Sequence, residues 1–325
     1  MNFKRRQLNI ITPVFNDWES LKALIQDLNE QGELLSYYKI KLIIMNDGST
    51  DSFPVINRDF LGRIDESVVA NLRYNMGHQK AISLGLKISA KDTTAEFHAV
   101  MDGDGEDRPS DLFRLVEGAR KHSKVTVAER KKRKESNFFQ LSYKLYKVFF
   151  KIVIGKSINF GNYCVIPAVH VDCIASSIDS WNHLAASLVK SPIDLLKIPL
   201  DRGDRYFGSS KLNFVGLALH GFSAISVFAD IAFVRMIIFS LILASFSIGT
   251  MIIVVGIRVF TDHAIPGWAT YSLGFSVSIF IQAIFIALVT LFLYLNSRSQ
   301  GLLLAEMNTT LEPYIRDYIK LKEAI

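Results

Sequence analysis

The last third of the chain contains two long stretches without a charged residue. The first covers 236–257, and the second runs from 264 to the arginine at 298. A helix of about 22 residues is about 33 Å long, against roughly 30 Å of hydrocarbon in a bilayer. The sequence therefore predicts transmembrane helices over 236–260 and 271–296, joined by a short external loop at 261–270.

Basic residues are distributed unevenly around these stretches. The connecting loop has only Arg258 near it, whereas Arg235 precedes the first stretch and Arg298, Arg316 and Lys320 follow the second. Lysine and arginine are enriched on the cytoplasmic side of membrane proteins. We therefore expect a multi-pass protein of the inner (plasma) membrane, with the region 1–211 and both termini in the cytoplasm. The short apolar run near the start is interrupted by a proline, so no signal peptide is expected.

The region 1–211 alternates between two hydrophobic periods. Short apolar runs typical of buried strands alternate with segments of helical spacing. The predicted strands are 8–14, 40–45, 96–101 and 124–128, and the predicted helices are 18–28, 78–88 and 109–120. This alternation predicts an α/β domain with a Rossmann-like, mostly parallel sheet covered on both faces.

Polar loops follow three of the predicted strands. They are the segments 13–17, 47–49 and 102–104. In open parallel sheets, ligands bind beyond the carboxyl ends of the strands. We therefore expect the three loops to converge on one crevice.

Two carboxylates, Asp102 and Asp104, stand one residue apart after the strand 96–101. If the chain continued in an extended conformation, both side chains would point to the same side. Mg²⁺ or Mn²⁺ is commonly held by one or two carboxylates together with the oxygens of a substrate diphosphate. The alternative is a polar turn, in which aspartate and glycine are common for conformational reasons.

Four sequence blocks, in this order, resemble family 2 glycosyltransferases of the GT-A fold. They are Pro13-Val14-Phe15-Asn16-Asp17, Asn46-Asp47-Gly48-Ser49-Thr50-Asp51, Asn75-Met76-Gly77-His78-Gln79-Lys80-Ala81 and Asp102-Gly103-Asp104-Gly105-Glu106-Asp107-Arg108-Pro109. The run from Arg202 to Lys211, just before the apolar stretches, makes the chain similar to the polyprenyl-phosphate (dolichyl-phosphate-like) sugar transferases. The chain departs from the family pattern at Asp17, Glu106 and Arg108, where Glu, Gln and Pro are usual.

The resemblance implies a set of site residues. The residues implied to bind the nucleotide sugar are Pro13, Phe15, Asn16, Asp17, Asp47, Ser49 and Asp102. The implied metal ligands are Asp102, Asp104 and Glu106, and the implied catalytic residues are Asp102, Asp104 and Arg130. Asp47 would contact the nucleoside; alternatively it is only a turn residue.

A lipid phosphate acceptor would need positive charge more than a general base. The second pKa of a phosphate monoester is about 6, so its nucleophilic oxygen is already ionised at neutral pH. Arginine presents a planar fork to phosphate oxygens. The candidate acceptor-phosphate residues are Arg130, Arg133, Arg202, Arg205, Ser210 and Lys211. Alternatively, the basic run 130–134 is solvated or attracted to anionic lipid.

Three further segments have helical spacing. Residues 137–154 fit either an interfacial helix or a surface helix packed on the sheet, and 212–235 fit a juxtamembrane amphipathic helix lying in the membrane plane. The segment 297–325 is expected to be a cytoplasmic tail helix, because Leu311, Ile315 and Tyr318 recur at helical spacing.

The sequence thus favours an inverting, metal-dependent glycosyltransferase, with Mg²⁺ or Mn²⁺ as cofactor. It would move a sugar from a nucleotide-diphosphate sugar, UDP favoured, to undecaprenyl or dolichyl phosphate on the cytoplasmic face. Inversion and a possible homo-oligomer are implied only by the resemblance, and no nucleic-acid partner is expected. The alternatives are a transferase of this fold with a glycolipid or polysaccharide acceptor, and a non-catalytic membrane scaffold. The sugar cannot be read from the residues without a bound pose.

Overall fold

The computed structural model describes residues 5–52, 54, 58–130, 150–208, 221–261, 267–307 and 311–321. The chain divides into two compact units. One unit contains the sheet and its helices together with the C-terminal residues, and the other consists of 148–155 and 228–306.

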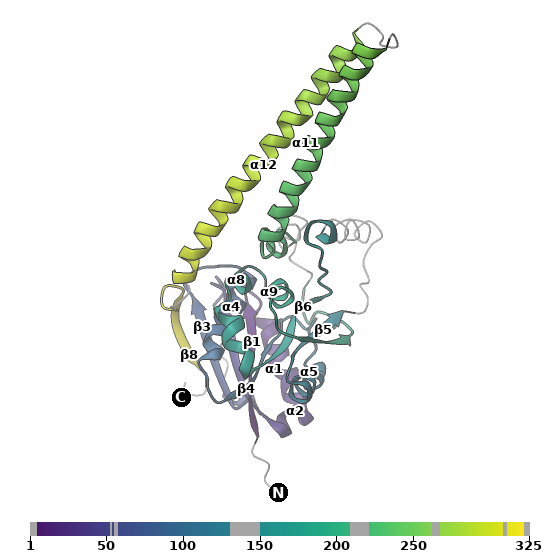
Figure 1. The fold of residues 1–325 in the computed structure, drawn as a ribbon. Coiled ribbons are helices and arrows are strands. Elements are labelled where there is room, and N and C mark those ends of the chain that lie inside the picture. Colours follow the sequence, from purple (N-terminus) through teal and green to yellow (C-terminus); the bar gives the residue numbers. More distant parts are fainter. Residues whose placement is uncertain are drawn as a thin grey trace. The chain divides into compact units, whose positions relative to one another are not determined.

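The first unit is built on an eight-stranded sheet (Figure 1). In spatial order the strands are β7 (Leu195–Leu200), β5 (Val125–Arg130), β6 (Phe160–Pro167), β4 (Ala95–Val100), β1 (Arg6–Val14), β2 (Tyr38–Asn46), β3 (Glu66–Leu72) and β8 (Ile315–Lys320). Strands β4, β1, β2 and β3 are parallel neighbours, and β5 is parallel to β7. Strands β6 and β8 run antiparallel to their partners. The predicted mostly parallel sheet is confirmed.

Helices cover both faces of the sheet, because each central strand is apolar on both sides. In β1, Leu8 and Ile10 belong to one buried cluster, and Ile11 belongs to the other. The first cluster includes side chains of α1 and α5, and the second includes side chains of α4 and α7. The helices are α1 (Trp18–Glu30), α2 (Gly32–Tyr37), α3 (Arg58–Leu61), α4 (His78–Ala90), α5 (Pro109–His122), α7 (Ala168–Ser176), α8 (Ile178–Asn182) and α9 (Leu184–Lys190). This three-layer arrangement places the carboxyl ends of the parallel strands at one edge of the sheet.

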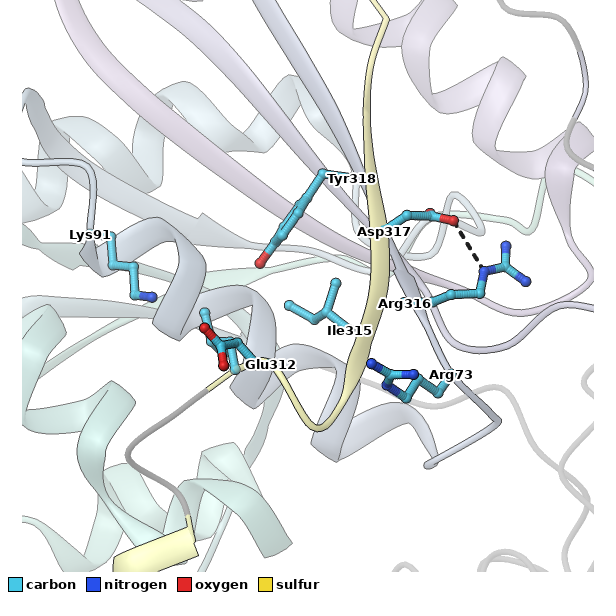
Figure 2. A pocket seen from close by; sticks show the side chains of 8 residues that line it. Arg73, Lys91, Glu312, Ile315, Arg316, Asp317 and Tyr318 are labelled. Atoms are coloured by element: carbon cyan, nitrogen blue, oxygen red, sulfur yellow. Dashed lines mark hydrogen bonds and ion pairs between the residues drawn. The ribbon is translucent and has the colours of Figure 1, made fainter.

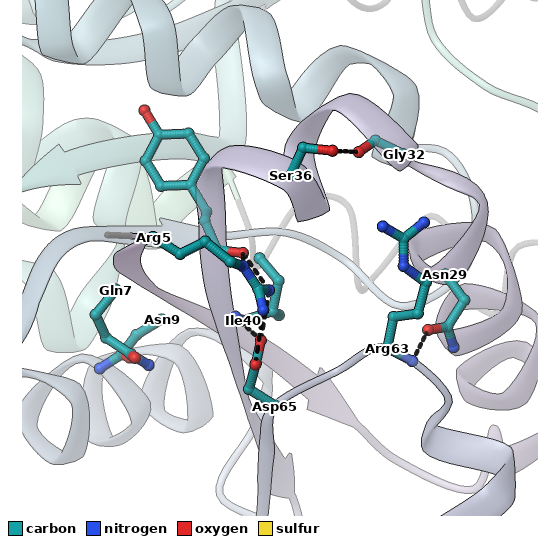
Figure 3. Close-up of polar contacts among 10 residues, drawn as sticks. Arg5, Gln7, Asn9, Asn29, Gly32, Ser36, Ile40, Arg63 and Asp65 are labelled. Carbon is teal, nitrogen blue, oxygen red and sulfur yellow. Dashed lines mark hydrogen bonds and ion pairs between the residues drawn. The ribbon is translucent and has the colours of Figure 1, made fainter. Parts of the chain in front are cut away.

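A charged clasp holds the start of β1 against the start of β2 (Figure 3). The Arg5 guanidinium donates two hydrogen bonds to Asp65, at 3.0 and 2.8 Å, and two more to the carbonyl of Tyr38. Asp65 also accepts from the backbone N–H of Ile40 at 2.9 Å. These contacts lie at the amino ends of the strands, so they stabilise the sheet without entering the expected crevice.

The second unit contains the two apolar helices, α11 (Ala229–Phe260) and α12 (Trp268–Met307). Within them, Ala229–Phe260 and Trp268–Leu295 are long and apolar enough to cross a membrane, with mean hydropathies of 2.5 and 2.4. The two helices lie side by side (Figure 1), and Ser247 Oγ donates a hydrogen bond to the carbonyl of Ser276. Most of their apolar side chains face outward, as expected for helices surrounded by lipid.

The predicted tail helix over 297–325 is wrong at residues 315–320. Residues 315–320 form β8, which pairs antiparallel with β3, with Val69 opposite Ile319. Tyr314 is buried, and its ring centroid lies 5.3 Å from that of Trp181. The unpaired edge of β3 offers backbone hydrogen bonds that a short tail helix would forgo, so tertiary pairing overrides the local spacing.

A hollow of about 510 Å³ lies where β8 meets the end of β3 (Figure 2). Its lining mixes basic Arg73 and Lys91 with acidic Glu312, and Arg316 pairs with its neighbour Asp317 at 3.1 Å. These charged side chains are exposed, and none of the residues expected to bind the nucleotide sugar or the metal lines this hollow.

Candidate active site

Asn16 joins the loop after β1 to the loop after β2. Its Oδ1 accepts from the backbone N–H groups of Thr50 and Asp51 at 2.9 and 3.2 Å, and its own N–H donates to Ser49 Oγ at 3.0 Å. The residue has a φ of 49°, a left-handed conformation that asparagine tolerates better than most residues. The first two predicted loops are therefore one hydrogen-bonded structure.

Asp47 is a buried clasp between the loop after β2 and the start of α4. Its two oxygens accept from the N–H groups of Met76 and Gly77 at 2.7 and 3.0 Å, and the residue is 3% exposed. Burial raises the pKa of this carboxyl, although the two N–H donors act in the opposite direction. Its hydrogen bonds thus position the loop before α4, and its contact with a nucleoside stays a prediction.

Other residues of the predicted donor set lie in the same loops. Pro13 is buried in β1 beside Met45 of β2, and Phe15 is 42% exposed at the loop tip. Asp17 precedes α1 and makes no capping hydrogen bond with its side chain. The convergence of these loops at the carboxyl edge agrees with the sequence analysis.

The acidic run after β4 is a compact turn, so the expected extended continuation is wrong. The Asp102 N–H donates to Asp107 Oδ2 at 2.9 Å, and the Glu106 N–H donates to Asp104 Oδ1 at 3.0 Å. Gly105 has a φ of 94°, which lets the chain reverse. Side chain to backbone hydrogen bonds within the run outcompete the extended conformation.

Asp107, which the sequence analysis did not select, is the buried centre of this turn. Burial and the charge of Asp102 raise the pKa of Asp107 to about 8. Its position just before the start of α5 was the only sequence signal of such a role. Asp107 shapes the turn, whereas Asp102 and Asp104 remain at least partly exposed.

His78, at the first position of α4, lies against Asp102. Its Nε2 is 3.2 Å from Asp102 Oδ1 and 3.0 Å from Asn162 Nδ2. Burial lowers the pKa of His78, but the charge and hydrogen bond of Asp102, together with the charges of Asp107 and Asp104, raise it overall. The Gln79 side chain accepts a hydrogen bond from the Leu184 N–H at 2.8 Å and donates one to Asn162 Oδ1 at 3.1 Å. This second bond orients the Asn162 amide so that its Nδ2 faces His78. Asn162 of β6 and Leu184 of α9 are distant in sequence from His78, so these contacts could not be found from spacing.

The segment after β7, residues 201–206, lies against the acidic turn; we call it the post-β7 segment. The Gly203 N–H donates to the carbonyl of Glu106 at 2.9 Å, and the Tyr206 N–H donates to the carbonyl of Asp104 at 2.8 Å. The Tyr206 hydroxyl donates to Asp27 Oδ2 at 2.7 Å. The post-β7 segment therefore belongs to the site itself.

Two arginines of this segment pair with the carboxylates of the site. Arg205 Nη1 lies 3.1 Å from Asp104 Oδ2, and its Nη2 lies 3.7 Å from Asp17 Oδ2. Arg202 is paired with Glu106. The structure thus brings together two predicted acceptor residues and three predicted donor or metal residues.

Arg130, at the end of β5, packs with its guanidinium against Gly161. A Cβ at Gly161 would lie 2.9 Å from Arg130 Nη2, so glycine leaves room for the arginine. The charge of Arg130 also contributes to a lowered pKa of Asp102, against burial and together with the larger effect of His78. Arg133, Ser210 and Lys211 lie outside the described residues.

The acidic turn fits a divalent cation in part. Asp102 Oδ1 is buried, and His78 Nε2 lies 3.2 Å from it. Asp104 and Glu106 face Arg205 and Arg202 instead. In the same part of the chain, no three His, Cys, Asp or Glu side chains form a group that could hold a metal. Carboxylate oxygens such as those of Asp102 and Asp104 are the ligand type that Mg²⁺ or Mn²⁺ prefers, but Asp104 and Glu106 are each paired with an arginine in this structure.

Comparison with known proteins gives a family match and individual relatives. Residues 9–177 match the family described as Glycosyl transferase family 2. The undecaprenyl-phosphate 4-deoxy-4-formamido-L-arabinose transferase of Enterobacter sp. (strain 638) is 24% identical over 293 residues, covering 87% of this chain and 86% of that enzyme. The dodecaprenyl-phosphate galacturonate synthase of Rhizobium johnstonii is 29% identical over 137 residues, covering 41% of this chain and 39% of that enzyme.

One solved structure supports the fold. Glucosyl-3-phosphoglycerate synthase from Mycobacterium tuberculosis, crystallised with phosphoglyceric acid, superposes with a TM-score of 0.50 at 11% identity. The match covers 70% of this chain and 80% of that chain. This likeness concerns the fold alone and agrees with the predicted GT-A-type sheet.

Proposed function

Since this chain belongs to glycosyl transferase family 2, we propose that it moves a sugar from a nucleotide-diphosphate sugar to a polyprenyl phosphate. The observation that carries the proposal is the meeting of Asp102 and Asp104 with Arg202 and Arg205 at the carboxyl edge of the sheet. The acceptor is inferred from the similarity to an undecaprenyl-phosphate sugar transferase over 87% of the chain.

The carboxylates suit the donor end of the reaction. Asp102 and Asp104 would hold Mg²⁺ or Mn²⁺, which when bound neutralises charge on a departing nucleoside diphosphate. The loops joined by Asn16 and Asp47 would receive the nucleotide, for which we favour UDP. The compact turn around Asp107 keeps the two aspartates in place, so the site is preorganised for charge that develops on the leaving group.

The arginines suit the acceptor end. A phosphate monoester is largely ionised at neutral pH, so the site needs to orient its oxygen and need not remove a proton. The guanidinium groups of Arg130, Arg202 and Arg205 lie near the acidic turn. One guanidinium can donate two parallel hydrogen bonds to two oxygens of a phosphate. We propose an inverting displacement, following the family resemblance.

The membrane segments suit a lipid substrate. Helices α11 and α12 could each cross a bilayer, and lysine and arginine are concentrated outside the loop that joins them. We propose that this loop faces away from the cytoplasm and that the catalytic unit is cytoplasmic. A polyprenyl phosphate would then present its headgroup at the membrane surface on the catalytic side.

Transfer of a labelled sugar tests the proposal. Purified protein in detergent is incubated with undecaprenyl phosphate and a panel of nucleotide sugars, with Mg²⁺ or Mn²⁺ and with chelator. We expect a labelled lipid that requires metal and is reduced at least about 100-fold in folded Asp104→Asn, since charge stabilisation supplies factors of this size. Donor hydrolysis or binding without any lipid product would point to a different acceptor. Wild-type activity of Asp104→Asn would contradict the assigned role.

A further inference from the structure

Arg205 is paired with Asp104, the carboxylate that the proposed function assigns as a ligand of the divalent cation. Its Nη1 lies 3.1 Å from Asp104 Oδ2, and its Nη2 lies 3.7 Å from Asp17 Oδ2. A guanidinium and a metal ion compete for the same carboxylate lone pairs. We propose that Arg205 is an internal counterion of Asp104 that leaves this carboxylate when a divalent cation binds, an inference that rests on the proposed function.

The local charges explain why a counterion is needed. The charges of Asp17 and Asp102 both act on Asp104, and each of the three side chains is less than a third exposed. Partly buried like charges are costly unless a positive group lies between or beside them. Arg205 supplies that charge in the structure, with Arg202 adding a second cation beside Glu106.

The exchange requires only a side chain to move. On either side of Arg205, the backbone is held by the Gly203 N–H bond to Glu106 and the Tyr206 N–H bond to Asp104. The Tyr206 hydroxyl adds an anchor on Asp27. The post-β7 segment can therefore stay docked while the guanidinium, on its flexible stem, changes partner.

Arg205 retains donor capacity for such a change. Its Nε is buried and makes no hydrogen bond to any described residue. A guanidinium has five N–H donors in a planar fork that matches phosphate oxygens. Once released from Asp104, Arg205 is placed to bind a phosphate of the donor or of the acceptor. Cation binding at Asp104 would thus make a positive group available where the substrates' phosphates meet.

The test measures Mn²⁺ affinity without any nucleotide sugar, by calorimetric titration of the full-length protein in detergent at pH 8. Arg205→Gln removes the competing charge, and we expect it to bind Mn²⁺ about tenfold more tightly than the wild type, the scale of a nearby unit charge acting on a divalent ion. Arg205→Lys keeps the charge and is expected to stay within about threefold of the wild type by the same argument. Arg316→Gln, which removes an exposed arginine on edge strand β8, serves as the matched control.

Two results would overturn the proposal and are distinguishable from failure of the proposed function. If Arg205→Gln binds Mn²⁺ no more tightly than the wild type while Asp104→Asn loses binding, Arg205 is not a competitor, although the metal-dependent transferase stands. If no protein binds Mn²⁺ and sugar transfer continues in chelator, displacement is excluded while transferase function stands.

Circular dichroism will show whether Arg205→Gln folds. If it does not, a second variant, Arg202→Gln, tests the same proposal. Arg202 is paired directly with Glu106, and its charge also interacts with those of Asp104 and Asp102. We expect Arg202→Gln to tighten Mn²⁺ binding by a smaller, severalfold factor. Unchanged or weaker Mn²⁺ binding in folded Arg202→Gln would then contradict displacement of the internal arginines.

Discussion

The backbone N–H of Asp102 donates a hydrogen bond to the side chain of Asp107 at 2.9 Å. This bond closes the acidic turn, and Asp107 is 4% exposed. The raised pKa of Asp107, caused by burial and by the charge of Asp102, favours its protonated form near neutral pH. A neutral side chain of the same shape should therefore substitute for it.

We predict that Asp107→Asn keeps the turn, whereas Asp107→Ala lowers the free energy of unfolding by about 1–3 kcal/mol, the usual cost of an unsatisfied buried polar group. Sugar transfer should fall with the alanine variant, because Asp102 and Asp104 lose their fixed positions. Thermal unfolding followed by tryptophan fluorescence and the transfer assay would check both effects. Equal destabilisation by the two substitutions would show that the charged form of Asp107 is needed.

His98 gives a prediction for the pH dependence of stability. It is 1% exposed, its Nδ1 lies 2.6 Å from Ser89 Oγ, and burial lowers the pKa of His98 to about 4. Between this value and the ordinary pKa of about 6.5, the unfolded chain binds a proton that the native protein does not. We therefore expect the contribution of His98 to the free energy of unfolding to be full above pH 6.5 and to fall by on the order of 3 kcal/mol as the pH decreases toward 4.

Unfolding temperatures measured from pH 8 to pH 4.5 would test this slope. His98→Gln removes the titrating group and should flatten the curve in this window, even if its overall stability is lower. His122, at the exposed end of α5, offers a matched control, and His122→Gln should leave the slope unchanged. A slope unaffected by His98→Gln would assign the acid sensitivity to other groups.

Asp47 gives a prediction about the loop before α4. An asparagine there retains one acceptor oxygen, so one of the two N–H donors of Met76 and Gly77 loses its partner. We expect Asp47→Asn to destabilise the protein by about 1–3 kcal/mol. Hydrogen exchange of the peptide covering 73–80 should become faster, while peptides of β5 serve as the internal reference. Unchanged hydrogen-exchange protection of residues 73–80 would contradict the proposed role of Asp47 in holding this loop.

Tyr314 tests the docking of the C-terminal strand. It is 9% exposed and lies against Trp181, so Tyr314→Ala should cost about 3 kcal/mol, as for other large buried side chains. Tyr318, on the same segment, is 50% exposed, and its replacement by alanine should change stability by only about 0.5 kcal/mol. Unfolding temperatures of both variants would check the difference. Similar effects of the two changes would argue against a buried anchor at Tyr314.

Local patterns were sufficient for the strands that carry the donor loops. The apolar runs that became β1, β2, β4 and β5, and the helical spacing of α1, α4 and α5, are properties of short segments. Strands β3, β6 and β7 were not predicted: β6 combines a glycine and an asparagine, and β7 a lysine and a proline, with its apolar residues. Their pairing within the sheet compensates for weak local preference.

The sequence by itself determined that the chain has an α/β domain, two helices apolar enough to cross a membrane, and acidic residues at strand ends. These features follow from periodicity, length and residue type, which neighbours in the chain define. Only the tertiary structure decided that Asp107 holds the acidic turn and that residues 315–320 form a strand. Likewise, the pairing of Arg205 with Asp104 joins residues about one hundred positions apart. Such partners meet only when the sheet has formed, because their contacts depend on strand order and loop packing.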